Sequence, residues 1–171
     1  MDLLLRTYAV FIAVGHWDDY WNDMNNFYLY FNSDDPDDFQ MFMISYDMDN
    51  TLGTTHNCGV QTDAGRHDPF KWGLDECVFI SKILSIDEYR ARYKEYLKAI
   101  AAPDSEFSYE RSIIRIREWQ DLIQPYLANA TGEDQVIQDL PASWSNNRWY
   151  RIMEDGSHNW FRIKCGVLSA L

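Results

Sequence analysis

The stretch from residue 17 to residue 53 decides the fold and points to a site. It contains three short segments, WD at residues 17–18, NFYLYF at 26–31 and YDMDNTLG at 46–53. Aromatic residues favour β-strands, and the aspartate-rich segment with a proline at 32–38 is typical of a turn. The stretch therefore predicts a β-hairpin with strands at 26–31 and 39–46.

Such a hairpin brings polar side chains from distant positions to one of its ends. Asn26 stands at the start of the first strand and Asp47 follows the antiparallel partner, so both lie at the end away from the turn. Asp18, in the loop that leads into the hairpin, can fold back to the same edge. Mg²⁺ takes oxygen ligands from one or two carboxylates and from substrate phosphates. The arrangement predicts a magnesium-nucleotide site with Asn26, Asp47 and Asp49 as metal ligands.

The composition indicates a single globular domain. The chain has 171 residues, of which 46% are hydrophobic, and this is enough to build a packed core. A formal net charge of -12 argues against a nucleic-acid partner, because phosphate backbones are bound by clustered lysines and arginines. We find no run of roughly 18 apolar residues that could span a membrane. A secretory signal is not expected either, because Asp2 stands where a basic segment would begin.

Helical periodicity and helix-ending residues predict that most of the chain is helical. We expect helices over residues 2–15, 75–84, 86–101, 109–127 and 160–171, with Asp2 as a cap of the first helix. Together with the hairpin these helices give a mostly helical α+β fold. We expect residues 1–53 to form the catalytic and metal-site half of this single domain and residues 74–171 to form a helical support region.

The D-x-D-x-T-x-G motif at residues 47–53 is compatible with several structures, of which a local turn is the simplest. An EF-hand loop is excluded, because Leu52 replaces the glycine of the sharp turn and Cys58 replaces the bidentate glutamate. The motif also resembles the nucleophile motif of haloacid-dehalogenase-type phosphatases, in which the first aspartate attacks phosphorus. That fold requires further strands between the later helices, and the sequence after Gly53 shows almost none.

A kinase-type site explains the three segments together. Phosphoryl transfer needs a carboxylate near the acceptor hydroxyl, an amide for one magnesium ion and an aspartate that joins metal to phosphate. Asp18, Asn26 and Asp47 follow one another in the order in which the C-terminal lobe of a kinase supplies these groups. Asn26 lies eight residues after Asp18 rather than the five of the kinase catalytic loop, so any match is to a relative of that loop.

Four segments resemble the spore-coat protein H (CotH) kinase family, a group of atypical secretory-type protein kinases. They are GHWD at residues 15–18, NFYLY at 26–30, SYDMDNTLG at 45–53, and IL at 83–84 followed by DEYRARY at 87–93. The resemblance covers residues 2 to about 100. It implies a protein-kinase-like C-lobe that uses Mg²⁺ and ATP to phosphorylate serine or threonine of a coat or cell-envelope protein. It also suggests a location in the spore coat, at the cell surface or outside the cell.

The resemblance assigns roles to individual residues. Asp18 matches the catalytic aspartate of the family, Asn26 the asparagine ahead of its aromatic strand, and Asp47 the metal-binding aspartate. Asp49 is either a second ligand or a residue that supports the ligands. Tyr46 departs from the tryptophan of the family, and the lysine of the nucleotide-binding N-lobe has no counterpart. We therefore expect a partial kinase domain without its N-lobe, with the missing N-lobe or an oligomer partner as a binding partner. The alternative is a non-catalytic kinase-like module for structural or surface interactions.

Overall fold

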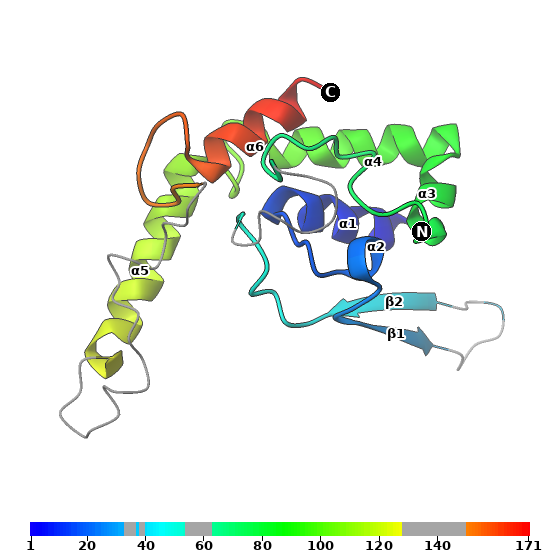
Figure 1. The fold of residues 1–171 in the computed structure, drawn as a ribbon, viewed down its shortest axis with the longest axis horizontal. Helices are drawn as coiled ribbons and strands as arrows, with labels where there is room; N and C mark the ends of the chain where they lie inside the picture. Colours follow the sequence, from blue (N-terminus) through cyan, green and yellow to red (C-terminus); the bar gives the residue numbers. More distant parts are fainter. Residues whose placement is uncertain (33–36, 38–39, 54–62, 128–149) are drawn as a thin grey trace.

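The computed structural model describes residues 1–32, 37, 40–53, 63–127 and 150–171. Their elements, in chain order, are α1 (Asp2–Val14), α2 (Tyr20–Asp23), β1 (Phe27–Asn32), β2 (Gln40–Ser45), α3 (Val78–Leu84), α4 (Asp87–Ile100), α5 (Tyr109–Leu127) and α6 (Trp160–Ser169) (Figure 1). Within the described ranges the sheet is a two-stranded antiparallel hairpin. The predicted α+β class is therefore confirmed.

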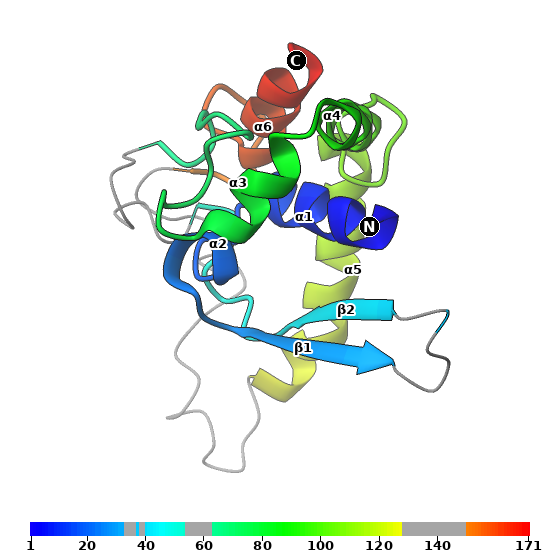
Figure 2. The same cartoon turned by 90° about the vertical axis from the view of Figure 1, so that its right-hand side faces the viewer.

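Helix α1 lies at the centre of the molecule. Figures 1 and 2 show α4 and α6 on one side of it and the hairpin on the other. The buried residues of α1 recur at spacings of one, three and four, so that most of its circumference is covered. They are Leu4, Leu5, Tyr8, Ala9, Phe11, Ile12 and Ala13.

The predicted cap of α1 was wrong. The helix begins at Asp2 itself, its N-cap is Met1, and no side chain caps it. The Asp2 carboxylate instead accepts a hydrogen bond from the Tyr96 hydroxyl of α4 and pairs with Arg6, one turn further along α1, at 3.0 Å. Asp2 therefore lies within the first turn of α1, where its negative charge interacts favourably with the positive end of the helix dipole.

Helix α4 covers α1 through an apolar stripe. Tyr93 and Leu97, four residues apart on one face of the helix, are completely buried. Charged residues occupy the rest of the helix, and Arg92, at the edge of the interface, pairs with Glu88 at 3.0 Å and with Asp2 of α1 at 3.7 Å. The predicted amphipathic helix is confirmed, with ends that differ from the prediction by one residue.

The hairpin register runs from the pair Phe27 and Ser45 to the pair Asn32 and Gln40. Successive side chains of a strand point to opposite faces. One face carries Met41 and Met43, which pack against the core. The other face, with Tyr28, Tyr30 and Ile44 among its members, is exposed. The hairpin was predicted correctly to within one residue at its described strand ends, and Phe39, its predicted second-strand start, lies outside the described residues.

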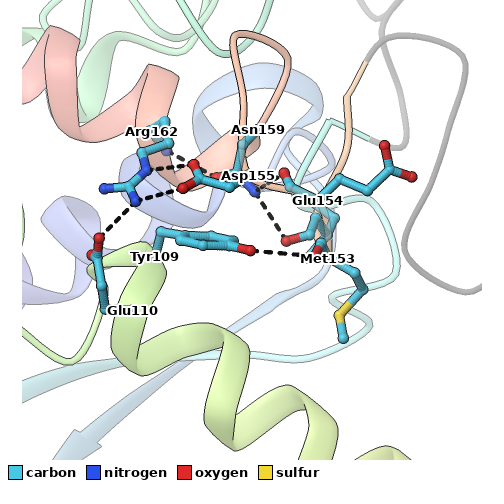
Figure 3. A network of polar contacts seen from close by, with 8 residues as sticks. Tyr109, Glu110, Met153, Glu154, Asp155, Asn159 and Arg162 are labelled. Carbon is cyan, nitrogen blue, oxygen red and sulfur yellow. Dashed lines mark hydrogen bonds and ion pairs between the residues drawn. The ribbon is translucent and has the colours of Figure 1, made fainter.

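Helix α5 runs away from the rest of the described structure (Figure 1) and contains Pro125 close to its end. Its first turn is tied to α6 by Arg162. The Arg162 guanidinium pairs with both oxygens of Asp155 at 2.9 and 3.0 Å, pairs with Glu110 at 2.6 Å and covers the Tyr109 ring (Figure 3). This junction fixes the start of α6. No helix in the described part of the chain is both long and apolar enough to cross a membrane.

Candidate active site

The loop that carries Asp18 is bonded to the segment that follows Asp49. The Trp17 amide donates to the Asn50 carbonyl at 3.0 Å, and the Leu52 amide donates to the Val14 carbonyl at 2.6 Å. These two backbone hydrogen bonds hold residues 14–17 beside residues 50–52. The predicted return of the Asp18 loop to the open end of the hairpin is therefore present in the fold.

Asp18 and Asn26 are in direct contact. The Asn26 Nδ2 donates to Asp18 Oδ2 at 2.7 Å, and the Asn25 Nδ2 donates to Asp18 Oδ1 at 3.1 Å. Asn26 is buried and Asp18 is half-buried. Two amides thus orient the carboxylate of Asp18. Because the amide nitrogen of Asn26 faces Asp18, its amide oxygen is the atom that it can offer to a cation.

The hairpin ends at two residues with left-handed backbone. Asn26 has φ 52° and Asp47 has φ 53°, and between them the Tyr46 amide donates to the Asn26 carbonyl at 3.2 Å. Asparagine and aspartate adopt this conformation at lower cost than other residues with a Cβ. The strand pairing therefore stops at two of the positions that the sequence assigned to metal binding.

His16 is a site residue that the sequence analysis missed. Its buried ring contacts the Ser45 hydroxyl through Nε2 at 3.1 Å, which joins the Asp18 loop to the strand that leads to Asp47. Burial lowers the pKa of His16, while Asp18, Asp49 and Asp47 act in the opposite direction. The imidazole therefore lies within electrostatic reach of all three carboxylates. The signal in the sequence was its place two residues before Asp18.

Comparison with known proteins places this geometry in a family. The family model described as CotH kinase protein matches residues 1–155. The chain belongs to the CotH kinase family. The resemblance seen in the sequence is thereby confirmed, and the match includes Asp18, the hairpin and Asp47. Searches among curated proteins and among solved structures give no match.

The predicted ligands of this CotH-family chain fit Mg²⁺ in kind, since all of them offer oxygen. Asn26, Asp47 and Asp49 lie at the same end of the hairpin, and the two aspartates are exposed. Across the described ranges, no three histidine, cysteine or acidic side chains are grouped closely enough to hold a metal ion. The fold thus gathers the segments that carry the ligands, and their assignment to a metal stays a prediction.

Asp19 adjoins Asp18 in the CotH-family loop but has a different environment. It is the N-cap of α2, and its side chain accepts from the Asn22 amide at 3.1 Å. Burial raises the pKa of Asp19 to about 7, against the effect of the hydrogen bonds from Asn22. This helix was not predicted, because the polar and aromatic residues between the first helix and the hairpin are typical of a loop. The start of α2 fixes the direction in which the chain leaves Asp18.

Two glycines allow aromatic rings to pack closely against the segments that carry the candidate site residues. Gly15 has φ 66°, and a Cβ there would lie 2.4 Å from the Trp160 ring. Gly53 has φ 78°, and a Cβ there would lie 2.1 Å from the Tyr150 ring. The Trp160 indole also donates to the Ala13 carbonyl at 3.0 Å. Both glycines are therefore required by their backbone conformation and by close packing.

Proposed function

We propose that this chain is a kinase that uses Mg-ATP to phosphorylate serine or threonine of a coat or cell-envelope protein. The observation that carries the proposal is the contact between Asp18 and Asn26, on a loop bonded to the segment that follows Asp49. This contact joins the candidate base to a candidate metal ligand. Membership of the CotH kinase family supports the same chemistry.

The proposed roles follow from the chemistry of phosphoryl transfer. The acceptor hydroxyl oxygen attacks the γ-phosphorus, ADP leaves, and Asp18 orients the hydroxyl and takes its proton. Asn26, Asp47 and Asp49 would hold Mg²⁺, which offsets charge on the phosphates. In this proposal residues 1–53 supply the active half of a kinase-like C-lobe, and residues 74–171 support it.

The exposed face of the hairpin supplies a place for the nucleotide base. Tyr28 and Tyr46 stack with ring centroids 5.1 Å apart at 28°, and both are exposed. They lie at the end of the hairpin that carries Asn26 and Asp47. An aromatic surface beside a magnesium-phosphate site suits a purine base, which stacks on tyrosine. We include this tyrosine pair in the proposed nucleotide site.

The test compares three aspartate variants. Mg-ATP is expected to raise the melting temperature of the wild-type chain, and Asp47→Asn is expected to remove that rise. Asn is chosen because it tolerates the left-handed backbone at this position. Asp18→Asn should still bind Mg-ATP but should not transfer radiolabelled γ-phosphate to a serine- and threonine-containing acceptor protein. The matched control is Asp104→Asn, a change of an exposed aspartate in the connection between α4 and α5.

A non-catalytic interaction module is the second candidate. The observation that favours it is the lack of a grouped set of metal-binding side chains in the described part of the chain. It predicts no thermal shift with millimolar Mg-ATP and partner binding that is indifferent to Asp18→Asn. The phosphatase interpretation finds no such support, since the described sheet is an antiparallel hairpin rather than the parallel sheet that fold requires.

A further inference from the structure

Lys164 of α6 is a charged side chain in the core of the molecule. It is completely buried, and its Nζ lies 4.6 Å from the Trp72 ring centroid and 5.2 Å from the Trp160 ring centroid. The ammonium donates a hydrogen bond to the Ala64 carbonyl at 2.9 Å. Within the described ranges, no carboxylate forms an ion pair with it. Two aromatic faces are therefore its main compensation for lost water.

A lysine in this place opposes the stability of the fold. Burial lowers the pKa of Lys164 to about 7, and Asp63 only partly counteracts this effect. A methionine would fill a similar volume without the cost of removing a charge from water. Buried charges without full compensation are typical of groups that serve function rather than stability.

The two tryptophans that enclose Lys164 also hold the backbone of the Asp18 loop. The Trp72 indole donates to the His16 carbonyl at 3.2 Å, and the Trp160 indole donates to the Ala13 carbonyl at 3.0 Å. Trp72 also meets the Trp17 ring edge-on, with centroids 4.8 Å apart. The loop between α1 and Asp18 is thus held at both ends by indoles whose faces attract the ammonium.

We propose that Lys164 is a positioning residue whose ammonium draws Trp72 and Trp160 together and thereby sets the loop that carries Asp18. The consequence for phosphoryl transfer rests on the proposed function, whereas the structural coupling does not. Helix α6 begins at residue 160, beyond the end of the family match at 155. The inference therefore assigns a role to a part of the chain that the family match does not include.

Other titratable groups adjoin the same tryptophans and must be separated from Lys164. The His67 ring lies 5.6 Å from the Trp72 ring, and burial lowers the pKa of His67. Asp63 accepts a hydrogen bond from the Tyr150 hydroxyl, and burial raises the pKa of that hydroxyl beyond the range of a neutral-pH titration. His67 is therefore the main competitor beside the tryptophans, and Asp19, whose pKa burial raises to about 7, is the main competitor beside Asp18.

The experiment is a pH titration by NMR of the full chain with ¹³C-labelled lysine and ¹⁵N-labelled side chains. The Lys164 Cε resonance is expected to titrate far below the ordinary lysine pKa of 10.5. The indole resonances of Trp72 and Trp160 should shift over the same pH range. The Asn26 side-chain amide, which reports its contact with Asp18, should shift with them. Lys164→Met should abolish these shifts, and they should remain in His67→Asn, in Asp19→Asn and in Lys82→Met, a change of an exposed lysine of α3.

Activity adds an independent measurement. If the proposed function holds, Lys164→Met should lower kcat by roughly 10- to 100-fold with little change in KM for Mg-ATP, as expected for a displaced catalytic group. The inference would be overturned if the Asn26 amide resonance did not shift when Lys164 titrates, or if it shifted with His67 instead. A responding amide in a chain without any phosphoryl transfer would support the positioning role and count against the proposed function alone.

Discussion

Replacing Lys164 with methionine is expected to stabilise the protein at pH 6. The lysine pKa falls from 10.5 to about 7 on folding, so the unfolded chain binds more protons between these values. Stability therefore rises with pH across this window, and the full cost of the buried charge is present below pH 7. At 1.36 kcal/mol per pKa unit, this cost is on the order of 5 kcal/mol.

The net gain is smaller than this cost. Attraction to two indole rings offsets about 2 kcal/mol or more, and the Ala64 carbonyl would lose its hydrogen bond at a cost of about 1 kcal/mol. We therefore expect Lys164→Met to be more stable than wild type by about 1–3 kcal/mol at pH 6. Above pH 7 the difference should shrink, and it should reverse in sign before pH 10, because wild type gains about 4 kcal/mol of stability between pH 6 and pH 10.

Urea unfolding of both chains between pH 6 and pH 10 measures this difference. Each kcal/mol should appear as a change in melting temperature of about 2–4 °C in a parallel thermal experiment. Lys82→Met, on the exposed face of α3, should change stability by less than about 0.5 kcal/mol at every pH. A Lys164→Met variant that is less stable than wild type at pH 6 would refute the reasoning, because the ammonium would then be a net source of stability.

Three further predictions follow. Burial raises the pKa of Asp19 to about 7, so wild type should lose about 4 kcal/mol of stability as the pH rises from about 4 to 7, and Asp19→Asn should not show this loss. Urea unfolding at several pH values measures the difference, and identical stability curves for the two chains would contradict the prediction. Gly15→Ala should destabilise the chain by about 2–4 kcal/mol in a urea titration, because a Cβ meets Trp160 at a positive φ, and a neutral effect would show that the loop can move. Tyr28→Ala should weaken binding of Mg-ATP by about 1–3 kcal/mol in calorimetry and leave Mg-tripolyphosphate unaffected; equal losses for both ligands would exclude a base-stacking role.

Local patterns in the sequence determine most of the elements. The aromatic run before the aspartate-rich turn predicts β1, and the alternation of Tyr93 and Leu97 with charged residues predicts α4. Helix α3 was predicted from residue 75, but it begins at Val78, because residues 74–77 form a turn in which the Cys77 amide donates to the Leu74 carbonyl. Helix α2 escaped prediction because it is only four residues long and begins at a buried aspartate cap.

The part of the candidate site that lies at the end of the hairpin could be predicted from the sequence. Antiparallel pairing alone places Asn26 beside the segment of Asp47, and the contact of Asn26 with Asp18 agrees with the expected return of the loop. Lys164 could not be found in this way. In the sequence it is one basic residue in an amphipathic helix, and its contacts are with Ala64 and Trp72, about 100 residues earlier in the chain.

Asp19 and Lys164, two of the buried ionisable groups near the Asp18 loop, contribute to stability with opposite dependences on pH. The cost of burying Asp19 grows as the pH rises toward 7, because its pKa is raised to about 7. The cost of burying Lys164 declines only above pH 7. The combined contribution of Asp19 and Lys164 to stability is therefore lowest near pH 7. Asp19 caps the helix that follows Asp18, and Lys164 lies behind the loop that precedes it. Buried ionisable groups thus lower the stability of the fold both before and after the proposed catalytic residue. This is expected where the placement of a reacting group is favoured over stability.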